Sequence, residues 1–203
     1  MFPHTKLNYS NVRSVTGGWL RNSDLFEVVG KKGVYRSAGV GGGITGMGGQ
    51  WLIIDDPIKN REEADSVTYR QSVWDWYTST FSTRQEADAR ILIIMTRWHG
   101  DDLVGRLLQI AQEEPKADQW KVINLPAIAE ESPSEYDWRS PGDPLWPERF
   151  SLSELERMKA SIGEYQWAAL YQQSPRSSGG TEWPNEYFGD NIWFDDWPNT
   201  ITL

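Results

Sequence analysis

The pattern of hydrophobic and polar residues alternates between short apolar runs and stretches with helical spacing. Two runs, WLIIDD at residues 51–56 and ILIIMT at 91–96, are continuously apolar and rich in isoleucine. Such runs are typical of strands that are buried on both faces of a parallel sheet. We also predict strands at VYRSAGV, residues 34–40, and at KVINLP, residues 121–126.

Helical spacing follows each of the two central strands. Apolar residues between them recur at near-helical intervals and predict a helix from about residue 62 to residue 81. After the second strand, Asp101 or Asp102 can cap a helix that carries leucines along one face. This alternation of strands and helices implies right-handed crossovers and an α/β fold, a parallel sheet flanked by helices.

The composition changes after about residue 125. Residues 126–150 are rich in proline, serine and acids, which predicts a long loop or linker. Ser151 and Glu154 then form a capping-box pattern at the start of a helical segment, which Gly163 is expected to divide into two short helices. The three predicted regions are 1–125, a helical linker at 126–175 and an irregular tail at 176–203.

Composition and charge exclude several classes of function. The chain has 203 residues, no cysteine and two histidines, so disulfides, thiolate zinc sites and multi-histidine metal sites are not expected. Its net charge of −9 argues against passive DNA binding through an overall basic surface. We find neither an apolar run long enough to span a bilayer nor a signal-peptide core, and therefore expect a cytoplasmic protein that does not contact a membrane.

The glycine-rich run GVGGGITGMGGQ, residues 39–50, invites comparison with a phosphate-binding loop. A Walker A loop has the form G-x-x-x-x-G-K-[ST] and opens a helix. Here no lysine follows the glycines, and the next element is a predicted strand. We therefore interpret the run as a surface loop, and no other part of the 203 residues carries the Walker A pattern.

The first candidate site residues are Asp55 and Asp56, which directly follow four apolar residues. Ligands of open α/β sheets bind beyond the carboxyl ends of the strands, where these two acids are expected. This is the Walker B pattern, in which the first acid helps to hold the Mg²⁺ of ATP and the second orients the attacking water. The alternative is that both residues only end the strand and begin a turn at Pro57.

The second strand ends with Thr96, Arg97, Trp98 and His99. Thr96 is a candidate to sense the γ-phosphate of the nucleotide. Arg97 is a candidate to contact phosphate, DNA or a neighbouring acid. We expect His99 to be a hydrogen-bonded structural histidine.

Four separate stretches resemble the large terminase subunit of tailed bacteriophages. They are residues 33–84, residues 91–108 (ILIIMTRWHGDDLVGRLL), LPAIAE at 125–130 and residues 145–175. The order and spacing of these unrelated stretches agree with the family, and the resemblance covers about residues 2–175. It implies part of an additional-strand P-loop NTPase-like domain that, with Mg²⁺ and ATP, drives double-stranded viral DNA into procapsids.

The resemblance also implies roles for single residues. Asp55 would be the Walker B carboxylate for Mg²⁺, Asp56 would stand in for the catalytic acid, and Thr96 would belong to the coupling motif. Relatives often have an arginine in the glycine loop where this chain has Met47. The implied partners are viral DNA, the small terminase subunit, the portal protein of the procapsid and sister large subunits, in the host cytoplasm.

The family's Walker A motif and its RNase H-like nuclease are expected outside this chain, so the chain alone is expected to have little ATPase activity. A second hypothesis is therefore a non-catalytic assembly module that keeps the contacts of the motor. The aromatic stretch EWPNEYFGDNIWFDDWP, residues 182–198, would then suit a groove on a partner. The alternatives are that it wraps its own domain or that the nuclease of the family covers it. A helicase-like translocase from outside phage biology is a third hypothesis.

Overall fold

The computed structural model describes residues 25–27, 33–44, 46, 48–131 and 133–175. The chain divides into two compact units. The units are Met1–Ile53 with Gln71–Leu92, and Ile54–Arg70 with Ile93–Leu203. All four predicted site residues belong to the second unit. The region boundaries predicted near residues 125 and 175 stay predictions, as does any role of Met47, which lies outside the described residues.

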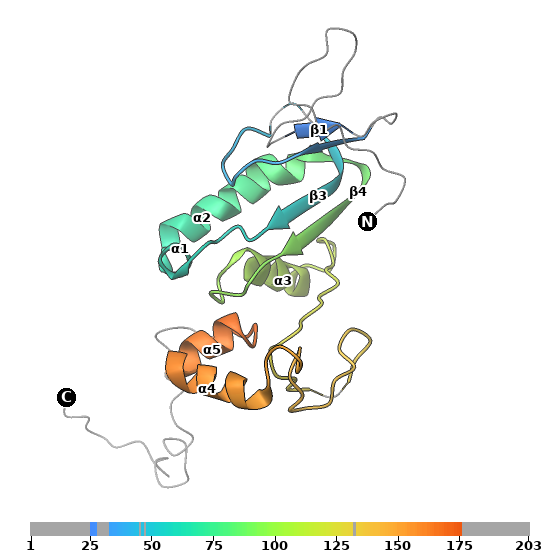
Figure 1. Cartoon of the computed structure of the whole chain (residues 1–203). Helices are drawn as coiled ribbons and strands as arrows, with labels where there is room; N and C mark the ends of the chain where they lie inside the picture. Colours follow the sequence, from blue (N-terminus) through green and yellow to red (C-terminus); the bar gives the residue numbers. More distant parts are fainter. Residues whose placement is uncertain (1–24, 28–32, 45, 47, 132, 176–203) are drawn as a thin grey trace, which may run out of the picture. The chain divides into compact units, whose positions relative to one another are not determined.

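The central element is a two-stranded sheet of β3 (Gly49–Asp55) and β4 (Gln85–Ile94). The two strands run parallel, and helices connect them along the chain (Figure 1). This arrangement confirms the predicted α/β class and both central strands, although β4 begins six residues before the predicted run at 91–96 and ends two residues before its last residue. A small parallel sheet is common to many α/β folds, so the P-loop NTPase relationship stays a prediction.

The burial of β3 differs from the prediction for a strand buried on both faces. Leu52 and Ile54 are buried, whereas Trp51 and Ile53 are 62% and 51% exposed. Successive side chains of a strand point to opposite faces, so within the described residues only one face of β3 is covered. The guanidinium of Arg90 on β4 lies 5.4 Å from the ring of Trp51 on the exposed face.

A second, antiparallel pair consists of β1 (Leu25–Glu27) and β2 (Val34–Arg36). The rings of Phe26 and Tyr35 stack across the pair with their centres 4.7 Å apart. The predicted strand at 34–40 is therefore confirmed for its first three residues only. Beyond it, the N–H of Gly42 donates to the carbonyl of Gly39 and begins a turn.

The predicted strand at 121–126 is wrong, because these residues form no strand in the structure. Val122 and Ile123 are 51% and 59% exposed. A strand is stable when a neighbouring strand satisfies its N–H and C=O groups, and an apolar run alone does not supply that neighbour.

The predicted helix at 62–81 forms as two helices and a wider turn. Asn60 caps α1 (Arg61–Asp65) by accepting the N–H of Glu63, at 2.9 Å. At Ser66 the chain restarts as α2 (Val67–Trp76), where the hydroxyl of Ser66 accepts the N–H of Tyr69. A π-helical turn at Tyr77–Phe81 and a 3₁₀ turn at Ser82–Arg84 then lead into β4.

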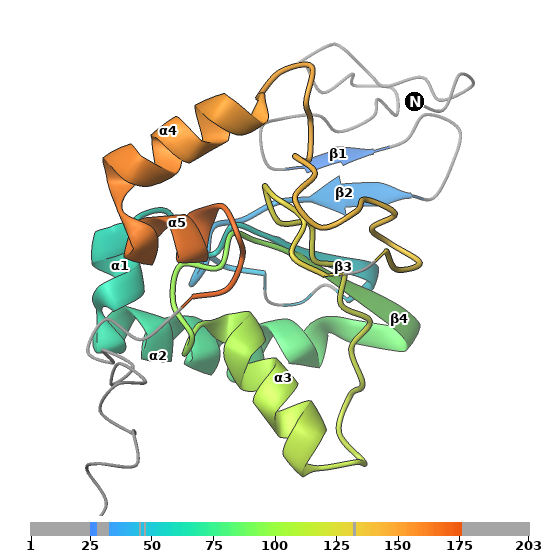
Figure 2. The same ribbon diagram turned by 90° about the horizontal axis from the view of Figure 1, so that it is seen from below.

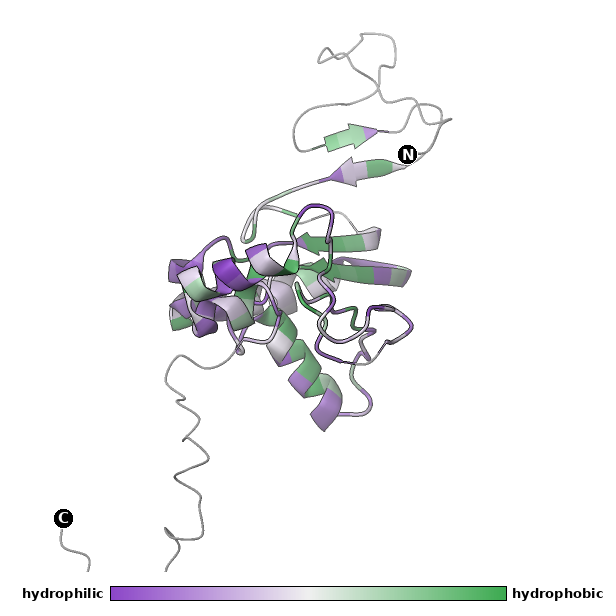
Figure 3. Ribbon diagram, turned by 60° about the horizontal axis from the view of Figure 1, so that its bottom comes forward, coloured by the Kyte–Doolittle hydropathy of each residue, from purple (hydrophilic) through white to green (hydrophobic). Residues whose placement is uncertain are grey.

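The helix predicted after Asp101 or Asp102 is α3 (Leu103–Glu113), and Asp102 is its N-cap. Its carboxylate accepts the N–H of Gly105 at 2.8 Å. Leu103 and Leu107, one helical turn apart, are buried, and Figure 3 shows separate apolar and polar bands on the helix. Both the helix and its apolar face are therefore confirmed.

The last two helices are α4 (Leu152–Ile162) and α5 (Glu164–Leu170), joined at Gly163 as predicted (Figure 2). Gly163 has a φ of 81°, which a residue with a side chain rarely adopts. Ser151 and Glu154 form the predicted capping box at the start of α4. None of the helices among the described residues combines the length and the hydrophobicity that crossing a membrane requires.

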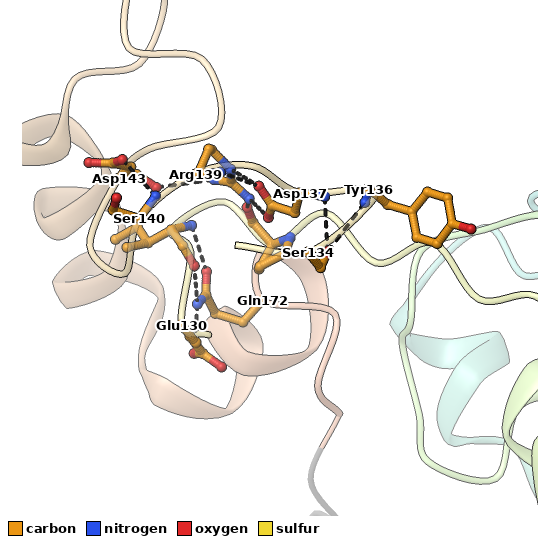
Figure 4. A network of polar contacts seen from close by, with 10 residues as sticks. Glu130, Ser134, Tyr136, Asp137, Arg139, Ser140, Asp143 and Gln172 are labelled. Carbon is orange, nitrogen blue, oxygen red and sulfur yellow. Dashed lines mark hydrogen bonds and ion pairs between the residues drawn. The ribbon is translucent and has the colours of Figure 1, made fainter. Parts of the chain in front are cut away.

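Residues 126–150 form the predicted long loop, and buried polar side chains hold its shape (Figure 4). Arg139 is 5% exposed and binds the carboxylate of Asp137 and the carbonyl of Pro126. Gln172, also 5% exposed, exchanges two hydrogen bonds with the backbone of Ile128. The loop therefore has one defined path beside the end of α5.

Candidate functional site

The predicted acids lie where β3 ends. Asp55 is the last residue of the strand and is exposed. Asp56 follows with a φ of 41°, in the left-handed region that aspartate tolerates better than most residues. Its N–H still donates to the carbonyl of Ile94 on β4, at 2.9 Å. The chain thus turns directly after its last contact with the neighbouring strand.

The turn brings the side chain of Asp56 to the end of the other strand. Its carboxylate oxygen Oδ1 accepts the backbone N–H of Thr96, at 3.1 Å. The structure therefore brings together two predicted site residues that are 40 positions apart in the sequence. An ionised carboxylate has about four lone-pair positions, so Asp56 keeps room to accept a bond from a water molecule.

Arg97 is placed against a neighbouring acid, one of the three partners predicted for it. Its Nε lies 2.8 Å from Oδ2 of Asp102, whose side chain is fully buried. Burial raises the pKa of Asp102, and the charge of Arg97 partly opposes that increase. The backbone N–H of Arg97 also donates to Oε1 of Gln173, at 3.0 Å. The backbone and the guanidinium of Arg97 are therefore both held in place, directly after Thr96.

A second ion cluster surrounds Asp101, which the sequence suggested only as a possible helix cap. The guanidinium groups of Arg70 and Arg106 lie 3.1 Å and 2.6 Å from its two carboxylate oxygens. Arg70 is 7% exposed and also donates to the carbonyl of Ala64. Arg70 lies 31 positions from Asp101, and a pair that distant leaves no local pattern in the sequence. Arg106 is only five positions from Asp101, but that pair was not predicted from the sequence.

His99 accepts the N–H of Asp101 on its Nδ1, at 2.9 Å. Burial and the nearby charge of Arg70 lower the pKa of His99 below its usual value. The lowered pKa favours the neutral ring, which is hydrogen-bonded within the turn that precedes α3, as expected for a structural histidine.

Arg61 forms the third cluster, which the sequence did not indicate. Its guanidinium donates to the carbonyl of Trp98 at 2.8 Å, to the hydroxyl of Tyr165 at 3.1 Å and to Oε1 of Gln166 at 2.6 Å. It also lies 4.7 Å from the ring centre of Tyr165 and 5.4 Å from that of Trp98. Arg61 thus joins α1 to the segment after Thr96 and to α5.

The Asp101 cluster predicts a specific acid sensitivity. Hydrogen bonding from Arg106 is the main cause that lowers the pKa of Asp101 to about 2. Because the pKa is below its unfolded value of about 3.9, Asp101 stabilises the fold above pH 4 and loses that contribution as the pH falls toward 2. We expect urea unfolding to show a loss of stability over this range that is smaller in Asp101→Asn. Equal losses in both proteins would contradict this assignment.

The strand ends suit Mg²⁺ in their chemistry. Among the residues that the structure describes, no three acidic or histidine side chains gather into a complete metal site. Mg²⁺ needs no such cage, since it commonly binds through one or two carboxylates together with substrate phosphates and water. Asp55, exposed at the strand end, and its neighbour Asp56 fit that requirement.

Comparison with known protein families gives one assignment for most of the chain. Residues 20–190 match the family described as terminase large subunit, T4likevirus-type, N-terminal. Comparison with curated proteins finds no match. The matched range contains β3, β4 and every residue of the site. The chain therefore belongs to the N-terminal family of T4-like terminase large subunits, which points to a role in phage DNA packaging.

Proposed function

We propose that this chain carries the Walker B half of the ATPase that drives viral DNA packaging. The observation that supports it best is the hydrogen bond from the N–H of Thr96 to Asp56, because it joins the two strand ends where such sites form. Asp55 would hold Mg²⁺ together with the phosphates of ATP. Bound there, the ion would supply positive charge against the negative charge that develops on the transferred phosphoryl group.

Asp56 has two tasks in this proposal. Oδ1 stays bound to the N–H of Thr96, which fixes the orientation of the carboxylate. The remaining lone pairs of the carboxylate hold and orient the attacking water. Hydrolysis changes the contacts of the γ-phosphate with Thr96. A shift of the Thr96 backbone then alters its hydrogen bond to Asp56.

Two side chains carry such a shift onward. Arg97 directly follows Thr96, and its ion pair with Asp102 connects this segment to the first turn of α3. Arg61 connects the carbonyl of Trp98 to α5. A contact of Arg97 with phosphate would require its ion pair with Asp102 to open. In the complete motor these helices would move double-stranded DNA, in company with the portal protein, the small terminase subunit and sister subunits in the host cytoplasm.

Paramagnetic NMR with Mn²⁺ and ATP tests the proposal on the chain itself. Mn²⁺ occupies magnesium sites and broadens amide signals close to it. We expect broadening to be strongest at residues 54–57 and 95–97, and to fall at least fivefold in Asp55→Asn. The reason is that Asp55 supplies the protein's ligand to the metal.

Asp118→Asn is the matched control, since Asp118 is an exposed aspartate of the same unit. This change should leave the broadening as it is. Broadening that persists in Asp55→Asn, or that affects all exposed acids alike, would remove the support for the site. In that case the non-catalytic assembly module becomes the better account of the chain.

A further inference from the structure

An apolar groove lies between α4, α5 and the long loop. Its volume is about 470 Å³, within the range of ordinary ligand pockets. Three loop side chains on its wall are much exposed for their type: Leu145 at 46%, Trp146 at 54% and Phe150 at 39%. The remaining lining residues include Leu125, Leu155, Met158 and Tyr171.

Hydrogen bonds hold the walls of the groove. Arg139 and Gln172 fix the loop by the buried hydrogen bonds seen in Figure 4. The capping box fixes the start of α4. A preformed apolar surface of this kind gains free energy when an apolar group covers it, because water leaves both surfaces.

One positively charged side chain, Arg149, lies against two rings of the groove wall. The guanidinium of Arg149 lies 5.4 Å from the ring centre of Trp146 and 5.3 Å from that of Phe150. Among the described residues, no carboxylate forms an ion pair with Arg149. An occupant that combines apolar rings with negative charge would therefore match both the wall and Arg149.

One segment of this chain has that chemistry. Residues 182–198, here called the aromatic segment, lie outside the described residues and contain no lysine or arginine. Its aromatic residues are Trp183, Tyr187, Phe188, Trp193, Phe194 and Trp197, and its acids are Glu182, Glu186, Asp190, Asp195 and Asp196.

The segment is also tethered close to the groove. Gln173 lines the groove, and the chain from Gln173 to Trp183 can extend about 30 Å. A short tether gives the segment an effective concentration of about a millimolar, so even weak intrinsic affinity fills the groove. We propose that the aromatic segment binds this groove in the same chain, with an aromatic ring on the apolar wall and an acid beside Arg149.

This binding is independent of the nucleotide site, and photo-cross-linking in the full chain tests it. The chain has no cysteine, so Met158→Cys provides a single position for a benzophenone label inside the groove. We expect cross-links within one chain to residues 182–198. They should fall at least fivefold when Trp183, Trp193 and Trp197 are all replaced by serine. Arg149→Glu should also reduce the yield, whereas Arg149→Lys should retain it.

The same label at Ala160→Cys is the matched control. Ala160 is exposed on α4 and lies about 140–160° around the helix from Leu155 and Met158. A label at Leu145→Cys, on the groove wall, repeats the test if Met158→Cys disturbs packing. Equal yields from positions 158 and 160 would overturn the proposal. So would cross-links formed only between chains, which would identify a second copy as the occupant, or a complete lack of cross-links to 182–198.

Discussion

Gly105→Ala is expected to lower the free energy of unfolding by about 2–3 kcal/mol, the cost of forcing an atom into a well-packed site. A Cβ at residue 105 would lie far inside the contact distance of the Gly100 carbonyl, and 3.3 Å from a guanidinium nitrogen of Arg97. The carbonyl belongs to the backbone and cannot rotate away. The first turn of α3 would have to move, which would strain the bond from Asp102 to the helix and its pair with Arg97.

The expected sign makes this test specific. Alanine in place of glycine inside a helix normally stabilises it by about 0.5–1 kcal/mol. Gly100→Ala is the matched control, because a Cβ there meets only the carbonyl of Pro175 at an ordinary 3.9 Å. Urea denaturation of the three proteins measures the difference. Stabilisation by Gly105→Ala would show that α3 does not approach the preceding loop this closely.

Arg61→Met is expected to cost about 2–3 kcal/mol of unfolding free energy. Methionine keeps the apolar stem of the side chain but lacks the guanidinium and all of its donors. The carbonyl of Trp98 and Oε1 of Gln166 would lose a charged donor, and such bonds contribute about 1.5–3 kcal/mol each without adding fully. Contacts of the guanidinium with two aromatic rings would be lost as well.

Arg157→Met on α4 is the control, since Arg157 is exposed and its replacement should change stability by less than about 0.5 kcal/mol. Arg61→Lys adds a second comparison. A lysine keeps the charge but lacks the planar fork that reaches Tyr165 and Gln166 together, so it should recover only part of the loss. Equal unfolding midpoints for Arg61→Met and Arg157→Met would contradict a structural link through Arg61.

Local patterns predicted the elements that depend on local interactions. The capping box at Ser151 and Glu154, a cap at Asp101 or Asp102 and the break at Gly163 were expected, and all three form, with Asp102 as the cap. Each of these depends on hydrogen bonds or dihedral angles within about four residues. The break at Ser66 was missed, because the flanking apolar residues continue at helical spacing across it.

Elements that need a distant partner were predicted less well. The apolar runs of β3 and β4 pair in one sheet, whereas the similar run at 121–126 forms no strand. Apolar character says that a strand is possible, but the hydrogen bonds of a sheet come from another part of the chain. The apolar run of β3 also predicted burial on both faces, but among the described residues only one face is covered. Burial of a face depends on the segments that pack against it, and a local pattern does not specify them.

The sequence by itself determined which residues stand at the ends of the two central strands: Asp55, Asp56, Thr96 and Arg97. Only the tertiary structure decided how they pair, with Asp56 bound to Thr96 and Arg97 bound to Asp102. Strand ends follow from a local apolar pattern, so a single stretch of sequence predicts them. Pairing depends on the left-handed turn at Asp56 and on the position of α3, which are set by contacts between segments distant in the chain. The bonds of Arg61 and the pair of Arg70 with Asp101 belong to this second class for the same physical reason, because they join residues 31 to 105 positions apart.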